Sequence, residues 1–139
     1  MNYLFVIGGV ALAALIFLAL YESYRSKNHS EPASVTDMVN DIADEQLVID
    51  HLDSKDLTAW FKQKNPNGSR KNVLIYPNEK NVASIKLPAS IKLGEEKTII
   101  QALLDADDNV VLCRSVIFTS INSNLEKLFE ENDGIIIVE

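Results

Sequence analysis

The chain opens with a long apolar stretch that no charged residue interrupts. It runs from Tyr3 to Tyr21, close to the ~20 residues that a helix needs to cross a ~30 Å hydrocarbon core. Phe5 and Tyr24 add aromatic rings near its two ends, where rings prefer the membrane interface. No Lys or Arg precedes the stretch and no small-x-small cleavage pattern follows it, which disfavours a cleaved signal peptide. The pattern predicts a transmembrane anchor helix over residues 1–21, with a buried core helix as an alternative.

Two basic residues set the expected orientation of this span. Arg25 and Lys27 follow it directly, whereas only the terminal amine precedes it. The positive-inside rule then predicts a single-pass signal-anchor protein of the cell membrane, with its N-terminus outside and its domain in the cytoplasm. Gly9 and Ala13 have the small-xxx-small spacing that lets membrane helices approach each other, so a homo-oligomer is an open alternative.

A polar segment separates the span from the rest of the chain. Residues 22–34 contain Pro32 and several serines, which predicts a flexible tether before a small domain over residues 35–139. Ser34 is placed to cap a helix whose apolar face would hold Val35, Met38, Val39 and Ile42. For the short apolar run that follows, within residues 45–53, the pattern does not decide between helix and strand.

A second helix is predicted after Ser54, where Leu57, Trp60 and Phe61 share a helical face and the turn residues 65–68 end the run. Most of the remainder has the pattern of strands. They are expected over residues 72–76, 82–87, 98–104, 109–119 and 135–138, and the two strands that flank the DADD turn should form a hairpin.

A capping box, Ser123-x-x-Glu126, predicts a short helix that ends at Asp133-Gly134. Together with the strands before and after it, this helix could form a right-handed parallel crossover. The predicted fold class is α+β (mixed α/β): a transmembrane helix followed by one small domain with a mainly antiparallel sheet of about 4–6 strands and 2–3 short helices.

Composition excludes several functions. The net charge is −7 and arises after the anchor, which disfavours nucleic acid as a partner. One cysteine and two histidines are too few for a zinc site, and no glycine-rich phosphate loop is present. The run Asp105, Asp107, Asp108, Asn109 resembles part of a calcium loop but lacks its glycine and distal glutamate. We therefore expect no metal and no cofactor.

Cys113 is the one candidate nucleophile, and it would need His51 beside it. A cysteine in the middle of an apolar strand is more often a small core residue. No catalytic motif marks any pair of carboxylates. We therefore expect a protein without enzymatic activity, and a small enzyme with an unrecognised site is the alternative.

Charge is distributed unevenly along the domain. Acidic residues crowd the segment from Asp37 to Asp56, and basic residues follow next to an aromatic side chain. The candidate interaction surface is Trp60, Lys62, Lys64, Arg70, Lys71, Asp41, Asp44 and Glu45. Although such runs are commonly just solvated faces, the pattern favours a membrane-tethered interaction module, an adaptor, scaffold or assembly component. Its partners would be the lipid bilayer, through residues 3–21, and a membrane-complex protein. With the opposite orientation, it would be an extracytoplasmic component of a secretion, pilus-like or cell-envelope assembly.

Overall fold

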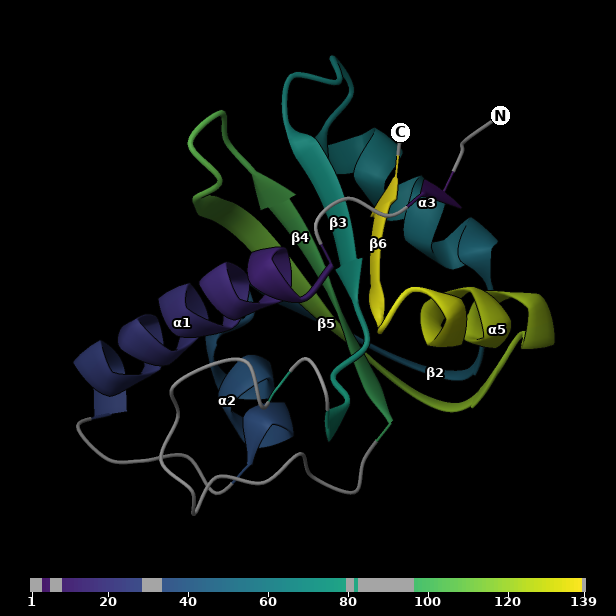
Figure 1. Cartoon of the computed structure of the whole chain (residues 1–139), viewed down its shortest axis with the longest axis horizontal. Helices are drawn as coiled ribbons and strands as arrows, with labels where there is room; N and C mark the ends of the chain where they lie inside the picture. The colour runs from purple at the N-terminus through teal and green to yellow at the C-terminus, as the bar shows by residue number, and fades with distance from the viewer. Residues whose placement is uncertain (1–3, 6–8, 29–33, 80–81, 83–96, 139) are drawn as a thin grey trace.

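The protein is a mixed α+β domain in which helices cover both faces of one sheet (Figure 1). The computed structural model describes residues 4–5, 9–28, 34–79, 82 and 97–138. In chain order the elements are β1 (Leu4–Phe5), α1 (Gly9–Asn28), α2 (Val35–Ile42), β2 (Glu45–Leu52), α3 (Ser54–Lys64), β3 (Lys71–Ile75), β4 (Thr98–Leu104), β5 (Val110–Ile121), α5 (Ser123–Glu131) and β6 (Ile135–Val138).

The sheet of the described residues has six strands in the order β1-β6-β3-β4-β5-β2. Four of its neighbouring pairs are antiparallel, and only β2 and β5 run parallel. The β4–β5 pair is the predicted hairpin, in which Ile100 lies opposite Ser115. The predicted class, a mainly antiparallel sheet with a few short helices, is therefore confirmed.

Alternation along the strands creates two apolar cores, because successive side chains point to opposite faces of a sheet. On one face Val73, Ile75 and Ile100 pack under α1 and α2. On the other face Leu74 and Ile99 pack under α3 and α5. Figure 1 shows these two pairs of helices on opposite sides of the strands. Strand β4 is buried along its whole length because it lies in the middle of this sandwich.

The first helix of the predicted domain forms as its pattern indicates. Ser34 caps α2, since its hydroxyl accepts the N–H of Asp37 at 3.0 Å. The apolar positions Val35, Met38, Val39 and Ile42 are all buried. The segment that the pattern left undecided is β2, an edge strand paired with β5. Helix α3 buries the three predicted apolar residues, but its N-cap is Asp53, not the serine that follows it.

Two details of the C-terminal third differ from the prediction. The N-cap of α5 is Asn122, one residue before the predicted capping box, and its side chain accepts two backbone N–H groups. The predicted parallel crossover through α5 is wrong, because β6 is separated from β5 by the strands β3 and β4 and runs antiparallel to it. The predicted turn is present, since Asp133 and Gly134 both have positive φ, 57° and 85°.

The N-terminal segment takes a different form from the predicted span. Its described part comprises the edge strand β1 and α1 as far as Tyr21, and Ile16, Phe17 and Leu20 are buried against α2 and the sheet. None of the helices in the described ranges is both long enough and apolar enough to span a membrane. An apolar helix face can be buried against a sheet as well as in lipid, which is why the sequence pattern alone did not separate the two.

Helix α1 continues into part of the predicted tether, as far as Asn28, while residues 29–33 lie outside the described part of the chain. The strand predicted over residues 82–87 also falls largely outside it. Only Val82 is described there, and its N–H donates to the Asn78 carbonyl at 3.0 Å in a helical turn.

Candidate functional site

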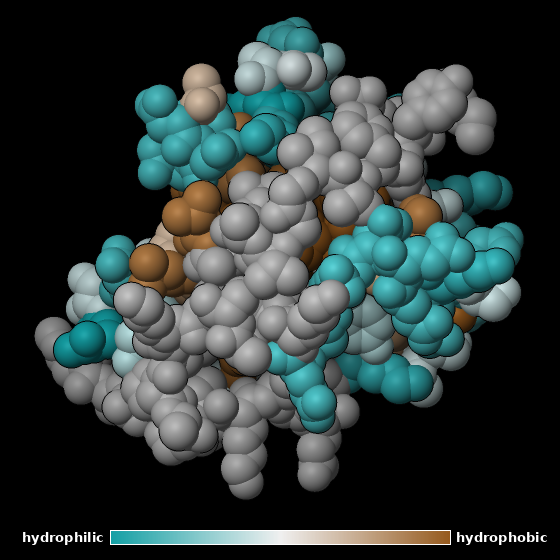
Figure 2. Space-filling view, viewed as in Figure 1, coloured by the Kyte–Doolittle hydropathy of each residue, from teal (hydrophilic) through white to brown (hydrophobic). Residues whose placement is uncertain are grey.

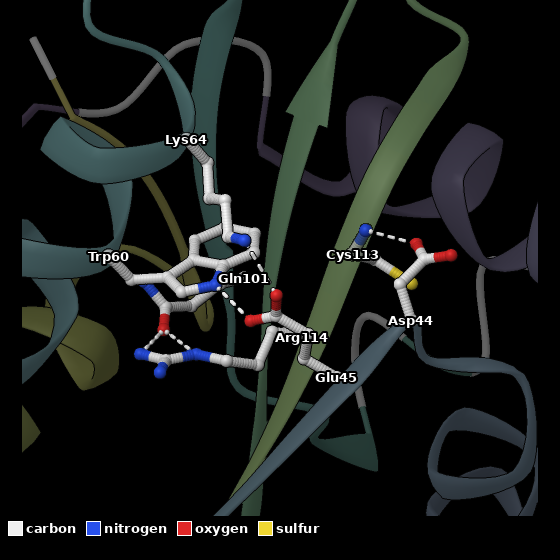
Figure 3. A network of polar contacts seen from close by, with 7 residues as sticks. All are labelled: Asp44, Glu45, Trp60, Lys64, Gln101, Cys113 and Arg114. Atoms are coloured by element: carbon white, nitrogen blue, oxygen red, sulfur yellow. Dashed lines mark hydrogen bonds and ion pairs between the residues drawn. The ribbon is translucent and has the colours of Figure 1, made fainter.

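Three residues of the predicted interaction surface meet one another in the fold. The Glu45 carboxylate, on β2, accepts the Trp60 indole N–H at 2.7 Å and pairs with the Lys64 ammonium at 2.7 Å (Figure 3). The hydrogen bond from Lys64, followed by that from Trp60, lowers the pKa of Glu45. Trp60 is only 3% exposed. The acidic segment and the basic run are therefore partly paired with each other, and this tryptophan belongs to the core.

A buried polar network lies directly beside this cluster (Figure 3). Arg114 donates from Nε to the Gln101 side-chain oxygen at 2.8 Å and from Nη2 to the same oxygen. Its guanidinium also lies over the Trp60 ring, 5.2 Å from the centroid. Gln101 in turn donates to the Leu57 carbonyl at 2.9 Å. These contacts fasten α3 to the middle of the sheet, and burial lowers the pKa of Arg114.

The other predicted surface residues are spread over the molecule. Lys71 pairs with Asp108 of the β4–β5 turn at 2.8 Å. Asp44 accepts the backbone N–H of Cys113 at 2.9 Å and so ties the start of β2 to β5. Asp41 lies on α2, Lys62 at the end of α3, and Arg70 before β3. The fold thus does not gather the eight residues into one surface.

Cys113 and His51 do not form a catalytic pair. Cys113 packs in the core under α1 and α2. The His51 ring bonds the Ser120 hydroxyl at 2.9 Å, and Ser120 follows Cys113 by seven residues along β5, which places it on the opposite face about 23 Å further along the strand. Burial raises the pKa of the Cys113 thiol to about 11, so the nucleophilic thiolate is disfavoured at neutral pH.

The acidic run after β4 is a structured turn. The Asp105 carboxylate accepts the N–H groups of Asp107 and Asn109, each at 2.9 Å, and these bonds lower the pKa of Asp105. Asp108 has the positive φ of 63° that such a turn requires. Within the described ranges, no three His, Cys, Asp or Glu side chains are grouped to hold a metal ion.

A concave site lies where β3 ends beside α5. It is a cleft of about 360 Å³ lined by Tyr76, Pro77, Asn78, Glu79, Glu126, Phe129, Glu130 and Gly134. We call it the acidic cleft. Aromatic packing holds the Tyr76 ring in place. Its centroid lies 5.5 Å from that of Phe129 and 5.8 Å from that of Phe118, in edge-to-face contacts. The backbone is fixed as well, because the Tyr76 N–H donates to the Gly134 carbonyl at 2.7 Å.

Three carboxylates surround this aromatic floor. Glu79, Glu126 and Glu130 are exposed, and no ion pair links any of them to another residue of the described chain. Desolvation, and then the charge of Glu126, raises the pKa of Tyr76, so this phenol stays neutral at physiological pH. Hydrophilic side chains gather over α5 (Figure 2). The cleft therefore presents negative charge above an apolar floor, which suits a cationic side chain.

In the sequence, Glu126 and Glu130 are only part of a predicted helix, and Glu79 lies after the strand predicted over residues 72–76. The cleft joins the end of β3 to a helix some fifty residues later, and no periodicity or motif signals that contact. The one local feature of the sequence that marks the cleft is Tyr76-Pro77, where an aromatic residue at the end of a predicted strand is followed by proline.

Comparison with known proteins gives no further constraint. No protein family model, no curated protein and no solved structure matches this chain.

Proposed function

We propose that this chain is a membrane-tethered, non-enzymatic protein-interaction module whose acidic cleft binds a basic side chain of a partner protein. The observation that carries the proposal is the set of three carboxylates without an ion-pair partner in the described chain, arranged around the Tyr76–Phe129 floor. A lysine or arginine has the matching chemistry, because its apolar stem can lie on the rings while its charged head remains among the carboxylates.

The charges elsewhere support the cleft as the contact point. Lys64 and Lys71 of the predicted basic surface already pair with Glu45 and Asp108. An ion pair within the chain has to be broken before either partner binds another protein, whereas Glu126 and Glu130 need no such rearrangement. A net charge of −7 also favours basic partners over acidic ones at long range.

The chemistry of the chain gives little support to an enzyme. Its only thiol, Cys113, is buried with a raised pKa of about 11. Its one described histidine on a strand, His51, faces away from that thiol. The proposal therefore assigns the carboxylates of the cleft to binding, with no bond-forming step.

Membrane tethering is supported by the N-terminal pattern and by the outer face of α1. Residues 3–21 carry no charge, and Leu15 and Leu18 of α1 are 55% and 42% exposed. Figure 2 shows apolar surface between the β4–β5 hairpin and α1. A helix that is apolar on several sides is typical of a membrane environment. Tethering would raise the local concentration of the cleft near membrane-complex partners, so that a weak contact is sufficient.

Peptide binding to the full chain in mild detergent tests the cleft. We would measure fluorescence anisotropy with a labelled peptide of lysines and arginines spaced by glycine and serine, and with a matched peptide carrying glutamine at the basic positions. We expect only the basic peptide to bind, and its affinity to fall as salt rises. The double variant Glu126→Gln/Glu130→Gln should weaken binding by about tenfold, because it removes two of the three carboxylates.

Glu131→Gln is the matched control. It removes one carboxylate charge from the same helix, half of what the double variant removes, but lies outside the cleft, where its contact is Lys127 at 4.0 Å. The control should bind like the wild type. If the control loses half or more of the binding free energy that the double variant loses, the effect is one of general charge, and the cleft is refuted as the site.

A further inference from the structure

Strand β2 ends the sheet, and no described strand pairs with its outer edge. It is eight residues long, and its central apolar residue Val48 is 72% exposed. Long apolar edge strands are templates for pairing, and proteins commonly protect them with prolines, bulges or inward-pointing charges. The centre of β2, Leu47-Val48-Ile49, has none of these. None of these residues lines the acidic cleft, so a role for this edge is independent of the proposed function.

The backbone of β2 also directs hydrogen-bonding groups outward at this position. In β5, the Phe118 N–H donates to Lys97 on the β4 side at 3.0 Å, so by alternation Val116 also faces β4. Val116 is the register partner of Leu47. In a parallel ladder, a residue bonds the two residues on either side of its register partner, so the backbone of Leu47 bonds the neighbours of Val116 in β5. Because backbone groups alternate in direction along a strand, the N–H and C=O groups of Gln46 and Val48 point away from β5. Val48 thus offers both an exposed side chain and a free backbone edge.

We propose that a second copy of this chain pairs with this edge, antiparallel and with Val48 opposite Val48. A two-fold axis perpendicular to the sheet at Val48 would join two six-stranded sheets into one continuous sheet. In this register Leu47 lies opposite Ile49, Gln46 opposite Asp50, and Glu45 opposite His51. Apolar residues meet apolar ones, polar residues meet polar ones, and no like charges lie directly opposite each other.

The neighbouring registers lack this complementarity. A two-fold axis perpendicular to the sheet requires opposed residues to point to the same face, so one strand can shift only by two residues relative to the other. The next allowed registers are therefore centred on Leu47 or Ile49. Centring on Leu47 sets Glu45 against Ile49 and Gln46 against Val48, whereas centring on Ile49 sets Val48 against Asp50. Both place polar groups opposite apolar ones. Of these three registers, the sequence of β2 is therefore self-complementary only in the one centred on Val48.

Disulfide crosslinking of the full chain tests the register. In a Cys113→Ala background, which removes the single native cysteine, Val48→Cys would place two thiols on Cα atoms about 5.5 Å apart, within the range of a disulfide. Gln46→Cys would place its two copies about 14 Å apart, beyond that range. We expect covalent dimers with Val48→Cys and not with Gln46→Cys. Mixing differently tagged Gln46→Cys and Asp50→Cys chains should give the mixed dimer.

Two outcomes would overturn the proposal. One is a Val48→Cys chain that folds normally but stays monomeric under mild oxidation. The other is equal crosslinking by Gln46→Cys, which would indicate random collision or another register. Sedimentation of the full chain adds a measurement without cysteines. Val48→Lys should weaken the dimer at least about tenfold, because it sets like charges face to face, while Val111→Lys, at another exposed apolar position of 39% exposure, should leave it unchanged.

Discussion

The buried contact between Gln101 and Arg114 allows the sharpest test of the fold. Gln101 is fully buried and Arg114 is 9% exposed. One amide oxygen accepts two N–H groups of the guanidinium, and the amide nitrogen donates to the Leu57 carbonyl. We consider Gln101→Leu, Arg114→Met and the double variant, which replace these polar groups with apolar side chains of similar size.

The single changes should be costly because each leaves a buried partner without its hydrogen bonds. Gln101→Leu leaves the Arg114 cation without its main acceptor and removes the side-chain donor to the Leu57 carbonyl, which should cost about 3–5 kcal/mol. Arg114→Met leaves the amide oxygen of Gln101 without a donor, at about 2–3 kcal/mol. The double variant removes both partners and should cost only about 1–2 kcal/mol, since the bonds that stay lost are mainly those to the carbonyls of Leu57 and Asp56, which belong to helix α3. The coupling energy is then about 3 kcal/mol or more.

Urea unfolding measures these free energies through the single tryptophan, Trp60, which lies beside Arg114. Far-UV circular dichroism gives a second probe that does not depend on this ring. Gln63→Leu, at an exposed glutamine on α3, is the matched control and should change stability by less than about 0.5 kcal/mol. If the losses in the two single variants simply add in the double variant, the contact is not energetically coupled and the reasoning is wrong.

Two further predictions concern Cys113 and the start of α5. The raised pKa of the Cys113 thiol, about 11 against 9.0, means that the folded state holds this proton more tightly. The protonated thiol should make its full contribution to the free energy of unfolding below pH 9. This contribution should decrease between pH 9 and about pH 11, by at most about 1.4 kcal/mol per pH unit. Urea unfolding of wild type and Cys113→Ala across this window measures it, and a difference that does not change with pH would contradict it. Asn122→Ala should lower the free energy of unfolding by about 1 kcal/mol, and Ser123→Ala should lower it by about half that or less. Equal losses of stability in the two variants on thermal unfolding would argue against Asn122 as the cap.

Local sequence patterns determined most elements of the fold. The face of α2, the apolar residues of α3, the β4–β5 hairpin and the turn at Asp133-Gly134 all form as predicted. Each depends on neighbours within a few residues, through caps, helical spacing or turn chemistry. The cap of α5 is one residue away from its predicted place because Asn122 and Ser123 are both capping residues. The choice follows from β5, which continues to Ile121, after which the Asn122 N–H donates to Leu52.

Contacts distant in sequence decided the candidate site. Glu45 and Lys64 belong to an acidic and a basic run in the sequence, and only the packing of α3 beside β2 brings them to 2.7 Å. The acidic cleft joins Tyr76 to Glu126. Strand β2 is identified as a strand by its pairing with β5, some seventy residues away. Such pairings follow from strand order, which periodicity does not encode.

The sequence by itself determined that residues 3–21 must be sheltered from water, because so long an uncharged stretch is costly to expose. It did not determine what shelters them, since lipid and an apolar sheet face satisfy the same pattern. Only the tertiary structure showed that Ile16, Phe17 and Leu20 of α1 are covered by the sheet, because one face of β3, β4 and β6 is left to be covered by α1. The hydrophobic effect acts on area and has no direction, so the pattern specified burial and the fold specified the partner.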